Sequence, residues 1–245
     1  MAIKNLKSKR VLVTGAASGI GLEIALSFAR RAAQLIIIDI NAGALENAQQ
    51  ELRKLGGQCH TYVADVSDPI IMKELAERVQ VEHGPLDVLV NNAGVAFLGS
   101  FQCTPIQQWH RTLNINVMGA VHGCQFFLPY MLEAGGARHI VNVASAAGLA
   151  PTLNMSAYSA SKHAVMGMSD SLSLELMGTR ISVSVVCPGI INTPITQVSP
   201  SGVGSNIRPD QVTKLGEYYR KNGAHPSVVG EAVVKAVRSG RGLYW

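Results

Sequence analysis

The feature that most constrains the fold lies near the amino terminus, where a short apolar run meets a glycine-rich turn. Val11-Leu12-Val13 is typical of a buried strand, and the turn after it has the spacing Gly15-x-x-x-Gly19-x-Gly21. Apolar residues then recur at helical spacing up to Arg31. A strand, a tight turn and a helix in this order point the amides of the helix amino terminus at a phosphate group. The stretch therefore predicts a phosphate-binding turn, although glycines at such spacing also occur in ordinary structural turns.

The glycines have distinct physical roles in such a turn. Gly15 lets the chain turn sharply, Gly19 lets the backbone approach a pyrophosphate, and Gly21 lets the helix pack closely on the strand. The turn is one residue longer than in the usual dinucleotide-binding pattern. Together the glycines predict the backbone shape that a dinucleotide requires.

An acidic residue ends the next apolar run. Residues 35–38 are large aliphatics, and Asp39 follows them, 18 residues after Gly21. A carboxylate at about this distance accepts hydrogen bonds from the ribose hydroxyls of an adenosine. The alternative is that Asp39 caps a helix that begins near Asn41.

Strand-like and helix-like runs alternate along the rest of the chain. Residues 190–223 show weak periodicity and many turn residues, so we expect a loop or lid there. We expect helices at 42–55, 68–83, 106–132, 156–177 and 228–237, and strands at 59–64, 88–90, 139–144, 182–187 and 243–245. Six or seven strands that alternate with helices predict one α/β domain over residues 1–245, with a doubly wound parallel sheet covered by helices on both faces.

The composition argues against several classes of function. The net charge of +5 is mild and the only basic cluster, within residues 4–10, is at the amino end, so we expect no nucleic-acid partner. The four cysteines stand far apart, and the seven histidines include no His-x-His or His-x-x-x-His pair, so we expect no disulfide and no metal. No apolar run is long enough for a signal peptide or a membrane span, which predicts a cytoplasmic protein.

Small or polar residues end the predicted strands. These ends are Thr14-Gly15, Asp39, Asp65, Asn91-Asn92, Ser145 and Pro188-Gly189. In doubly wound sheets, ligands bind outside the carboxyl ends of the strands, near the point where the strand order reverses. We therefore expect the functional site at this edge of the sheet.

The segment Tyr158-Ser159-Ala160-Ser161-Lys162 carries the second chemical signal. Tyr158 and Lys162 are four residues apart in a predicted helix, so their side chains lie on one face. A buried ammonium beside a phenol lowers the pKa of the phenol from about 10 toward neutral pH, which makes it a usable general acid or base. Ser145 stands at a strand end, where its hydroxyl can hold a substrate oxygen. Taken alone, a Tyr/Lys pair at this spacing is more often a surface feature.

Six motifs follow one another in an order that is typical of the short-chain dehydrogenases/reductases. They are Thr14-Gly15-x-x-x-Gly19-x-Gly21, Asp65, Asn91-Asn92-Ala93-Gly94, Ser145, Tyr158-x-x-x-Lys162 and Pro188-Gly189. The chain therefore resembles this family of Rossmann-fold oxidoreductases over nearly its whole length.

The resemblance implies a role for each of four catalytic residues. Tyr158 would be the general acid/base, and Ser145 would bind the substrate oxygen. Lys162 would bind the nicotinamide ribose and lower the pKa of Tyr158. Asn116 would hold a water that links Lys162 to solvent; Asn114 is the nearby competitor, but the Asn-x-x-Gly context favours Asn116.

The resemblance also implies the cofactor contacts. Asp65 and Val66 would meet the adenine, residues 91–94 the adenine ribose, and Ile191 and Thr193 the carboxamide. The full set is Gly15, Ser18, Gly19, Ile20, Gly21, Asp39, Asp65, Val66, Asn91, Asn92, Ala93, Gly94, Tyr158, Lys162, Pro188, Gly189, Ile191 and Thr193. NAD is expected rather than NADP, because the carboxylate of Asp39 would repel a 2′-phosphate and neither the glycine turn nor Ile40-Asn41 supplies an Arg or Lys.

The residues expected near the nicotinamide are mostly apolar. They are Val95, Phe97, Leu98, Leu149, Leu153, Met155, Ile190 and Ile195, although several of them would serve equally as core. The resemblance thus predicts hydride transfer between NAD(H) and a hydrophobic secondary alcohol or ketone, such as a lipid-, steroid- or alicyclic-like compound. The alternatives are a 3-oxoacyl-type reductase and a non-catalytic dinucleotide-binding regulatory protein. A homodimer or homotetramer through the helices at 106–132 and 156–177 is also implied.

Overall fold

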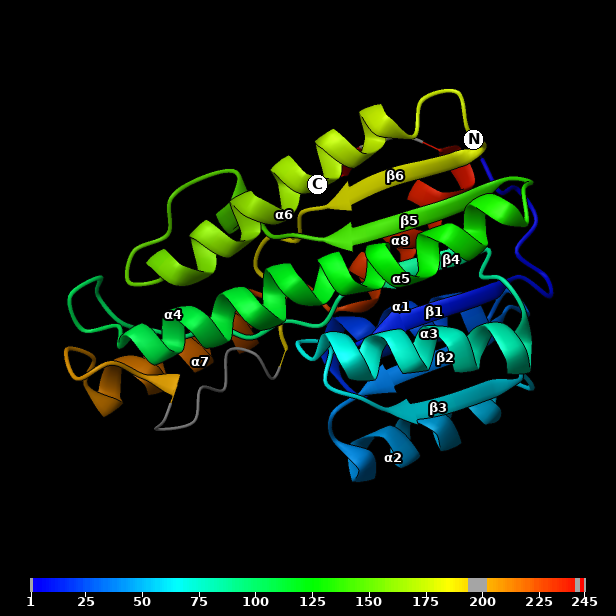
Figure 1. Ribbon diagram of the computed structural model, residues 1–245. Coiled ribbons are helices and arrows are strands. Elements are labelled where there is room, and N and C mark those ends of the chain that lie inside the picture. The colour runs from blue at the N-terminus through cyan, green and yellow to red at the C-terminus, as the bar shows by residue number, and fades with distance from the viewer. Residues whose placement is uncertain (1, 194–201, 241–242, 245) are drawn as a thin grey trace.

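Seven parallel strands in the described part of the chain form one sheet with the order β3-β2-β1-β4-β5-β6-β7 (Figure 1). The computed structural model describes residues 2–193, 202–240 and 243–244. The strands are β1 (Arg10–Thr14), β2 (Gln34–Asp39), β3 (Cys59–Val63), β4 (Val88–Asn91), β5 (Arg138–Val143), β6 (Ile181–Val186) and β7 (Leu243–Tyr244). The chain order reverses at β1, which lies between β2 and β4, so the predicted doubly wound parallel sheet is confirmed.

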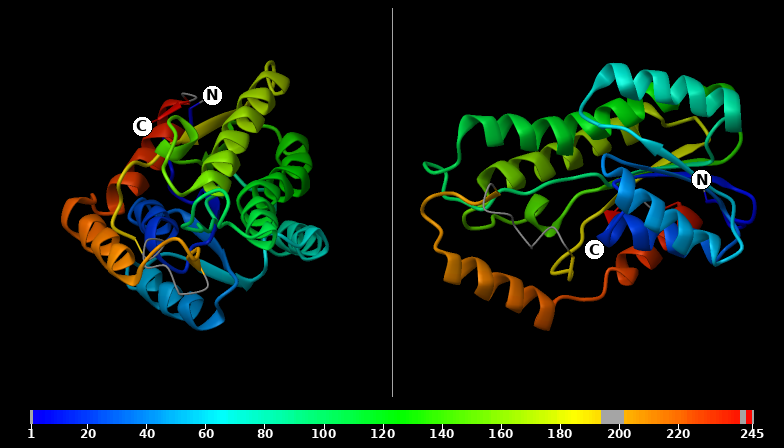
Figure 2. Two further views of the ribbon diagram at one scale, coloured as in Figure 1. Left: turned by 90° about the vertical axis from the view of Figure 1, so that its left-hand side faces the viewer. Right: turned by 90° about the horizontal axis from the view of Figure 1, so that it is seen from below.

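Helices cover both faces of the sheet (Figure 2). One face carries α1 (Gly19–Ala29), α2 (Ala42–Arg53) and α8 (Ser227–Ser239), and the other carries α3 (Pro69–His83), α5 (Gly119–Glu133) and α6 (Ser156–Glu175). Successive strand residues point to opposite faces, so Val11 and Val13 join the core under α1, while Leu12 joins the core under α3 and α5. All three are fully buried, which explains the continuous apolar run.

Local sequence signals account for where two of the helices begin. The Asn41 side chain accepts a hydrogen bond from Ala44 N at 3.0 Å and caps α2. Asp68 accepts from the amides of Ile70 and Ile71 and caps α3, with Pro69 in the first turn. Both residues belong to the types that satisfy the free amides of a helix amino terminus.

Two predicted segments differ from the structure. The helix expected at 106–132 consists of α4 (Ile106–Leu113), a π-helical turn at Asn114–Met118 and α5. The region expected as a loop or lid contains a helix, α7 (Pro209–Asn222). None of the α7 residues is fully buried, and most of them are polar, so the sequence offers few large apolar residues by which to predict this helix. None of the described helices is long and apolar enough to cross a membrane.

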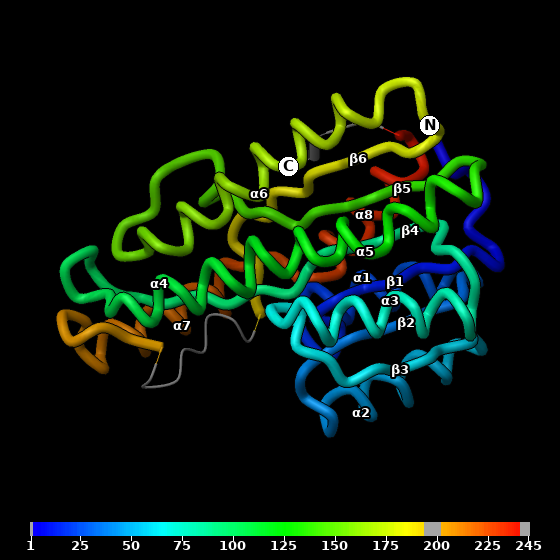
Figure 3. Tube along the Cα trace, in the orientation of Figure 1, coloured from blue at the N-terminus to red at the C-terminus, as the bar shows by residue number. Residues whose placement is uncertain are grey.

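The strands all point the same way. The strand arrows in Figure 1 point toward the side from which α4 and α7 project, and Figure 3 shows these two helices on that side of the sheet. The polar residues predicted at the strand ends are therefore gathered at one edge of the sheet, as expected from the parallel arrangement.

Candidate active site

Two glycines of the turn between β1 and α1 stand where a side chain would not fit. Gly15 has φ +63°, and a Cβ there would lie 2.8 Å from Ala93 Cα. A Cβ on Gly21 would overlap the carbonyl oxygen of Gly15. Ser18 precedes α1 without capping it through its side chain, so the amides of the first turn stay available. The turn therefore has the open, amide-lined shape that binds phosphate.

Asp39 lies beside this turn at the end of β2. Its Oδ2 accepts from Ala17 N at 3.0 Å, and its Oδ1 accepts from Asn41 N at 3.0 Å. Since Asn41 itself caps α2, Asp39 is not the helix cap that the alternative interpretation required. Each carboxylate oxygen retains acceptor capacity for a ribose hydroxyl.

A cavity of about 550 Å³ extends from the glycine turn to Tyr158 and Lys162 along the carboxyl edge of the sheet. The predicted residues that line it are Gly15, Ser18, Gly19, Ile20, Gly21, Asp39, Asp65, Val66, Asn92, Ala93, Gly94, Tyr158, Lys162 and Thr193. The lining also contains Ile40, Ala64, Ser67, Arg111, Ile115, Val143 and Ala144, which were not predicted. Most of these unpredicted residues are sequence neighbours of a predicted residue, so including a few more residues at each strand end would have predicted them.

Asn91 does not line the cavity. Its side chain is buried under α5, where Nδ2 donates to Asn142 Oδ1 at 2.9 Å and to Cys124 Sγ at 3.4 Å. Asn92, the next residue, points the opposite way, and its Nδ2 donates to the carbonyl oxygens of Thr14 and Gly15. Asn91 thus joins β4 to β5, while Asn92 ties the end of β4 to the glycine turn.

Three residues of the predicted cofactor set lie just outside this cavity. Pro188 and Ile191 are buried after β6, and Gly189 between them is exposed. Ile191 pairs with Ala224, so the segment after β6 is attached to the carboxyl end of α7. Thr193, two residues further, does reach the cavity.

Lys162 is buried below the ring of Tyr158. Its Nζ donates to Val143 O at 2.9 Å and lies 5.6 Å from the centre of the Tyr158 ring. Burial lowers the pKa of Lys162 to about 8. The ammonium is therefore directed at the end of β5 and the cavity, and it contacts the face of the phenol ring.

The pKa of Tyr158 differs in direction from the sequence-based prediction. Burial raises it, a hydrogen bond with Ser145 lowers it, and the nearby phenol of Tyr219 raises it again. Lys162 is not among the groups that shift the pKa of Tyr158 in this structure; its Nζ donates to the Val143 carbonyl.

Ser145 sits where β5 ends and a short 3-10 turn begins. Its Oγ accepts from Ala147 N at 3.1 Å, and the same side chain is hydrogen-bonded with Tyr158. The turn packs tightly on α6, since a Cβ on Gly148 would lie 2.9 Å from Lys162 O. The strand end and the helix therefore hold Ser145 and Tyr158 together, as the sequence predicted.

Asn116 lies in the π-helical turn and is buried. Its Oδ1 accepts from Val95 N at 2.8 Å, and its Nδ2 donates to Val95 O and to Ser161 Oγ, both at 2.9 Å. A Cβ on Gly94 would be 3.3 Å from Asn116 Oδ1 and 3.5 Å from Lys162 Nζ, so the Asn116 amide and the Lys162 ammonium both lie next to Gly94. Asn114 is exposed at the rim of the cavity.

The segments expected to contact substrate come together beyond Tyr158. Leu98 pairs with Val203, and Gly99 pairs with Met155. Leu149, Leu153 and Ile190 are exposed at this end, whereas Phe97 is buried and packs the interior. The sequence-predicted Ile195 lies outside the described residues. Among the described residues, no group of three or more His, Cys, Asp or Glu side chains could hold a metal ion.

Comparison with known proteins identifies the family. A family model described as short chain dehydrogenase matches residues 9–203. The chain belongs to the short-chain dehydrogenase family. It has the Rossmann fold that a solved member of the family also has.

Two curated short-chain dehydrogenase relatives differ in how much of their length is matched. The chain is 39% identical over 231 residues to the probable oxidoreductase EphD of Mycobacterium tuberculosis, covering 93% of this chain but 39% of that protein. It thus spans about two fifths of the length of the first curated relatives it matches. It is 35% identical over 208 residues to the 1-deoxy-11-beta-hydroxypentalenate dehydrogenase of Streptomyces exfoliatus, covering 82% of this chain and 75% of that protein.

A solved short-chain dehydrogenase has nearly the same structure. It comes from Burkholderia phymatum and was determined in complex with NAD. The TM-score is 0.90 at 29% sequence identity, over 98% of this chain and 89% of that chain.

The cavity of this short-chain dehydrogenase fits a nicotinamide dinucleotide at both ends. The uncapped first turn of α1 offers amides to a pyrophosphate, and Asp39 offers acceptors to a ribose. At the other end, Lys162 Nζ and the Tyr158 phenol offer donors. The residues that line the cavity therefore match a dinucleotide, which has a pyrophosphate at its centre and a ribose on each side.

Proposed function

We propose that this protein is an NAD(H)-dependent oxidoreductase that transfers a hydride between nicotinamide and a hydrophobic secondary alcohol or ketone. The observation that carries the proposal is the meeting of Ser145, Tyr158 and Lys162 at one end of a cavity whose other end holds the glycine turn. When bound, the nicotinamide supplies the hydride chemistry, which side chains lack.

Tyr158 is assigned the proton transfer at the substrate oxygen. Ser145, hydrogen-bonded with Tyr158, orients that oxygen by donating a hydrogen bond to it. Burial lowers the pKa of Lys162 to about 8, so this amine exchanges a proton near neutral pH. Asn116 holds the loop after β4 against α6 and is assigned the water that connects Lys162 to solvent.

NAD is the proposed cofactor because of the charge at the end of β2. Asp39 is fixed by the amides of Ala17 and Asn41, so it cannot turn away from a 2′-phosphate without losing both hydrogen bonds. Repulsion between the carboxylate and the phosphate disfavours NADP. The related protein of Burkholderia phymatum, determined with NAD, supports this choice.

An apolar substrate is proposed because the segments expected to contact it expose apolar side chains. Leu149 and Leu153 precede α6, which carries Tyr158, and Ile190 follows β6; all three expose large aliphatic side chains. The relative named 1-deoxy-11-beta-hydroxypentalenate dehydrogenase supports an alcohol substrate. Lipid-like, steroid-like and alicyclic alcohols are the classes to test first.

The test measures the turnover of a panel of apolar secondary alcohols with NAD+. The absorbance of NADH reports the rate, and the same panel is measured with NADP+. We expect reduction of NAD+ with at least one alcohol and much slower reduction of NADP+. Binding of NADH without turnover of any alcohol, acyl thioester or ketone would contradict the proposal and favour a regulatory dinucleotide-binding protein.

We also propose a homodimer or homotetramer assembled through α5 and α6, in a reducing compartment such as the cytoplasm. Met118, Leu132 and Leu174 are exposed apolar residues on or beside these helices. The four cysteines are all free thiols. Light scattering on the purified protein measures the assembly, and a monomer at micromolar concentration would contradict it.

A further inference from the structure

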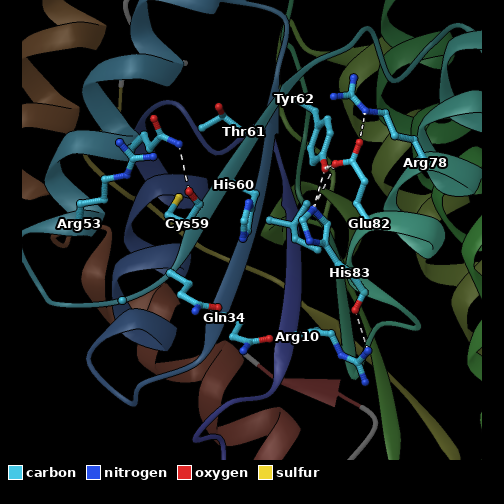
Figure 4. Close-up of a pocket in the computed structure, with 14 residues that line it drawn as sticks. Arg10, Gln34, Arg53, Cys59, His60, Thr61, Tyr62, Arg78, Glu82 and His83 are labelled. Carbon is cyan, nitrogen blue, oxygen red and sulfur yellow. Dashed lines mark hydrogen bonds and ion pairs between the residues drawn. The ribbon is translucent and has the colours of Figure 1, made fainter.

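A second cavity, of about 820 Å³, lies at the amino ends of β2 and β3 (Figure 4). The cofactor cavity lies at the carboxyl ends of the same strands, so the two are separate. Its lining includes Arg10 from β1, His60 and Tyr62 from the edge strand β3, and Arg78, Glu82 and His83 from α3. The proposed reaction uses none of them.

Two imidazole rings lie side by side in this cavity. The ring centroids of His60 and His83 are 4.2 Å apart, with 41° between the ring planes (Figure 4). His60 is exposed, and in the part of the chain that the structure describes its ring nitrogens have no hydrogen-bond partner. At least one imidazole is therefore free to bind a ligand.

Tyr62 determines which nitrogen of His83 is free. Its Oη lies 2.5 Å from Glu82 Oε2 and 2.6 Å from His83 Nε2. Burial and the bond to Glu82 raise the pKa of Tyr62, so the phenol keeps its single proton and donates it to the carboxylate. His83 Nε2 must then donate to the phenol oxygen, which leaves Nδ1 for another partner.

Positive charge is in excess around the two rings. Arg10 Nη1 donates to His83 O at 2.8 Å, and the guanidinium of Arg78 binds Glu82 at 2.7 Å. Glu82 is the only carboxylate among the described residues of the lining, and Arg78 already neutralises it. Burial lowers the pKa of His83, and the charges of His60, Arg10 and Arg78 lower it further. The negative charge of Glu82 raises it, but the net shift is downward. An added negative charge would therefore favour the protonated form of His83.

We propose that this cavity binds a small phosphate-bearing anion against the paired rings of His60 and His83. Phosphate oxygens accept charge-assisted hydrogen bonds from His60 and from Nδ1 of His83. Arg10 and, from α2, Arg53 add positive charge to the same cavity. A bound phosphate anion places negative charge beside His83, so its binding should raise the pKa of this imidazole.

Inorganic phosphate is the probe, and the histidine ring protons are the readout by NMR. We expect saturable shifts of the His60 and His83 resonances and a rise in the pKa of His83, relative to sodium chloride at equal ionic strength. Because the readout belongs to these two rings, phosphate that enters the glycine turn does not produce it. His60→Gln and His83→Gln assign the two resonances.

His60→Gln also tests the binding itself. This exposed residue is replaceable without loss of the fold, and we expect phosphate affinity, read at His83, to fall at least about tenfold. His110→Gln, an exposed histidine on α4 outside the cavity, is the matched control and should bind as the wild type does. Shifts no larger than in chloride, or an undiminished affinity in His60→Gln, would overturn the proposal.

Discussion

Asn116 and Ser161 are joined by a buried hydrogen bond of 2.9 Å, from Nδ2 to Oγ, although 45 residues separate them in the chain. Ser161 Oγ in turn donates to Tyr158 O at 2.7 Å. The π-helical turn is thereby connected to the helix that carries Tyr158 and Lys162. The alignment of the proposed catalytic residues depends on this link between two helices.

Ser161→Ala should lower the free energy of unfolding by about 1–3 kcal/mol, because it removes one partner of the buried Asn116 amide. Urea denaturation measures the loss. Ser159→Ala is the matched control on the same helix, since Ser159 Oγ is buried without a partner among the described residues. The control should lose less, and an equal loss in both variants would show that the Asn116 bond contributes nothing.

Tyr158→Phe should abolish most turnover and leave NADH binding intact. The substitution removes the hydroxyl that exchanges a proton with substrate, a contribution of about 100-fold to 10,000-fold. Steady-state rates measure the first effect, and NADH fluorescence titration measures the second. Turnover at the wild-type rate would refute the role of Tyr158.

Asp39→Asn should reduce the preference for NAD+ over NADP+ by about tenfold or more, since it removes the charge that repels a 2′-phosphate while keeping the shape. The measurement is kcat/KM with each cofactor. Glu46→Gln, which removes the same charge from the exposed side of α2, should leave the preference unchanged. A preference that survives in Asp39→Asn would place the discrimination elsewhere.

His139 should make the protein less stable as the pH falls. Burial lowers its pKa to about 3, and its Nε2 lies 2.7 Å from Ser184 Oγ in the core. Below its ordinary pKa of about 6.5, the unfolded chain binds a proton that the folded chain does not, so stability present above pH 6.5 is lost progressively toward pH 3.

Between pH 7 and pH 5 this loss should be about 2 kcal/mol, measured as the difference between urea unfolding free energies. His139→Gln should reduce the difference, whatever its effect at pH 7. His110→Gln, at an exposed site, should keep it. A pH dependence identical in wild type and His139→Gln would contradict the prediction.

Short-range patterns were sufficient to predict much of the fold and site. The glycine turn, the strand ends and the Tyr158–Lys162 spacing all lie within single turns or adjoining elements, where periodicity and steric rules apply directly. Helix α7 was not predicted, because most of its residues are polar and only Val212 and Leu215 are aliphatic.

By itself, the sequence determined the doubly wound parallel sheet and which residue types stand at its carboxyl edge, because strand and helix periods and glycine turns are local properties. Only the tertiary structure decided which way those residues point. It directed Asn91 into the core and Asn92 toward the glycine turn, and it engaged Lys162 with the Val143 carbonyl. It also brought His60 against His83. Such outcomes depend on packing between segments distant in the chain, where burial and neighbouring charges set orientation and pKa.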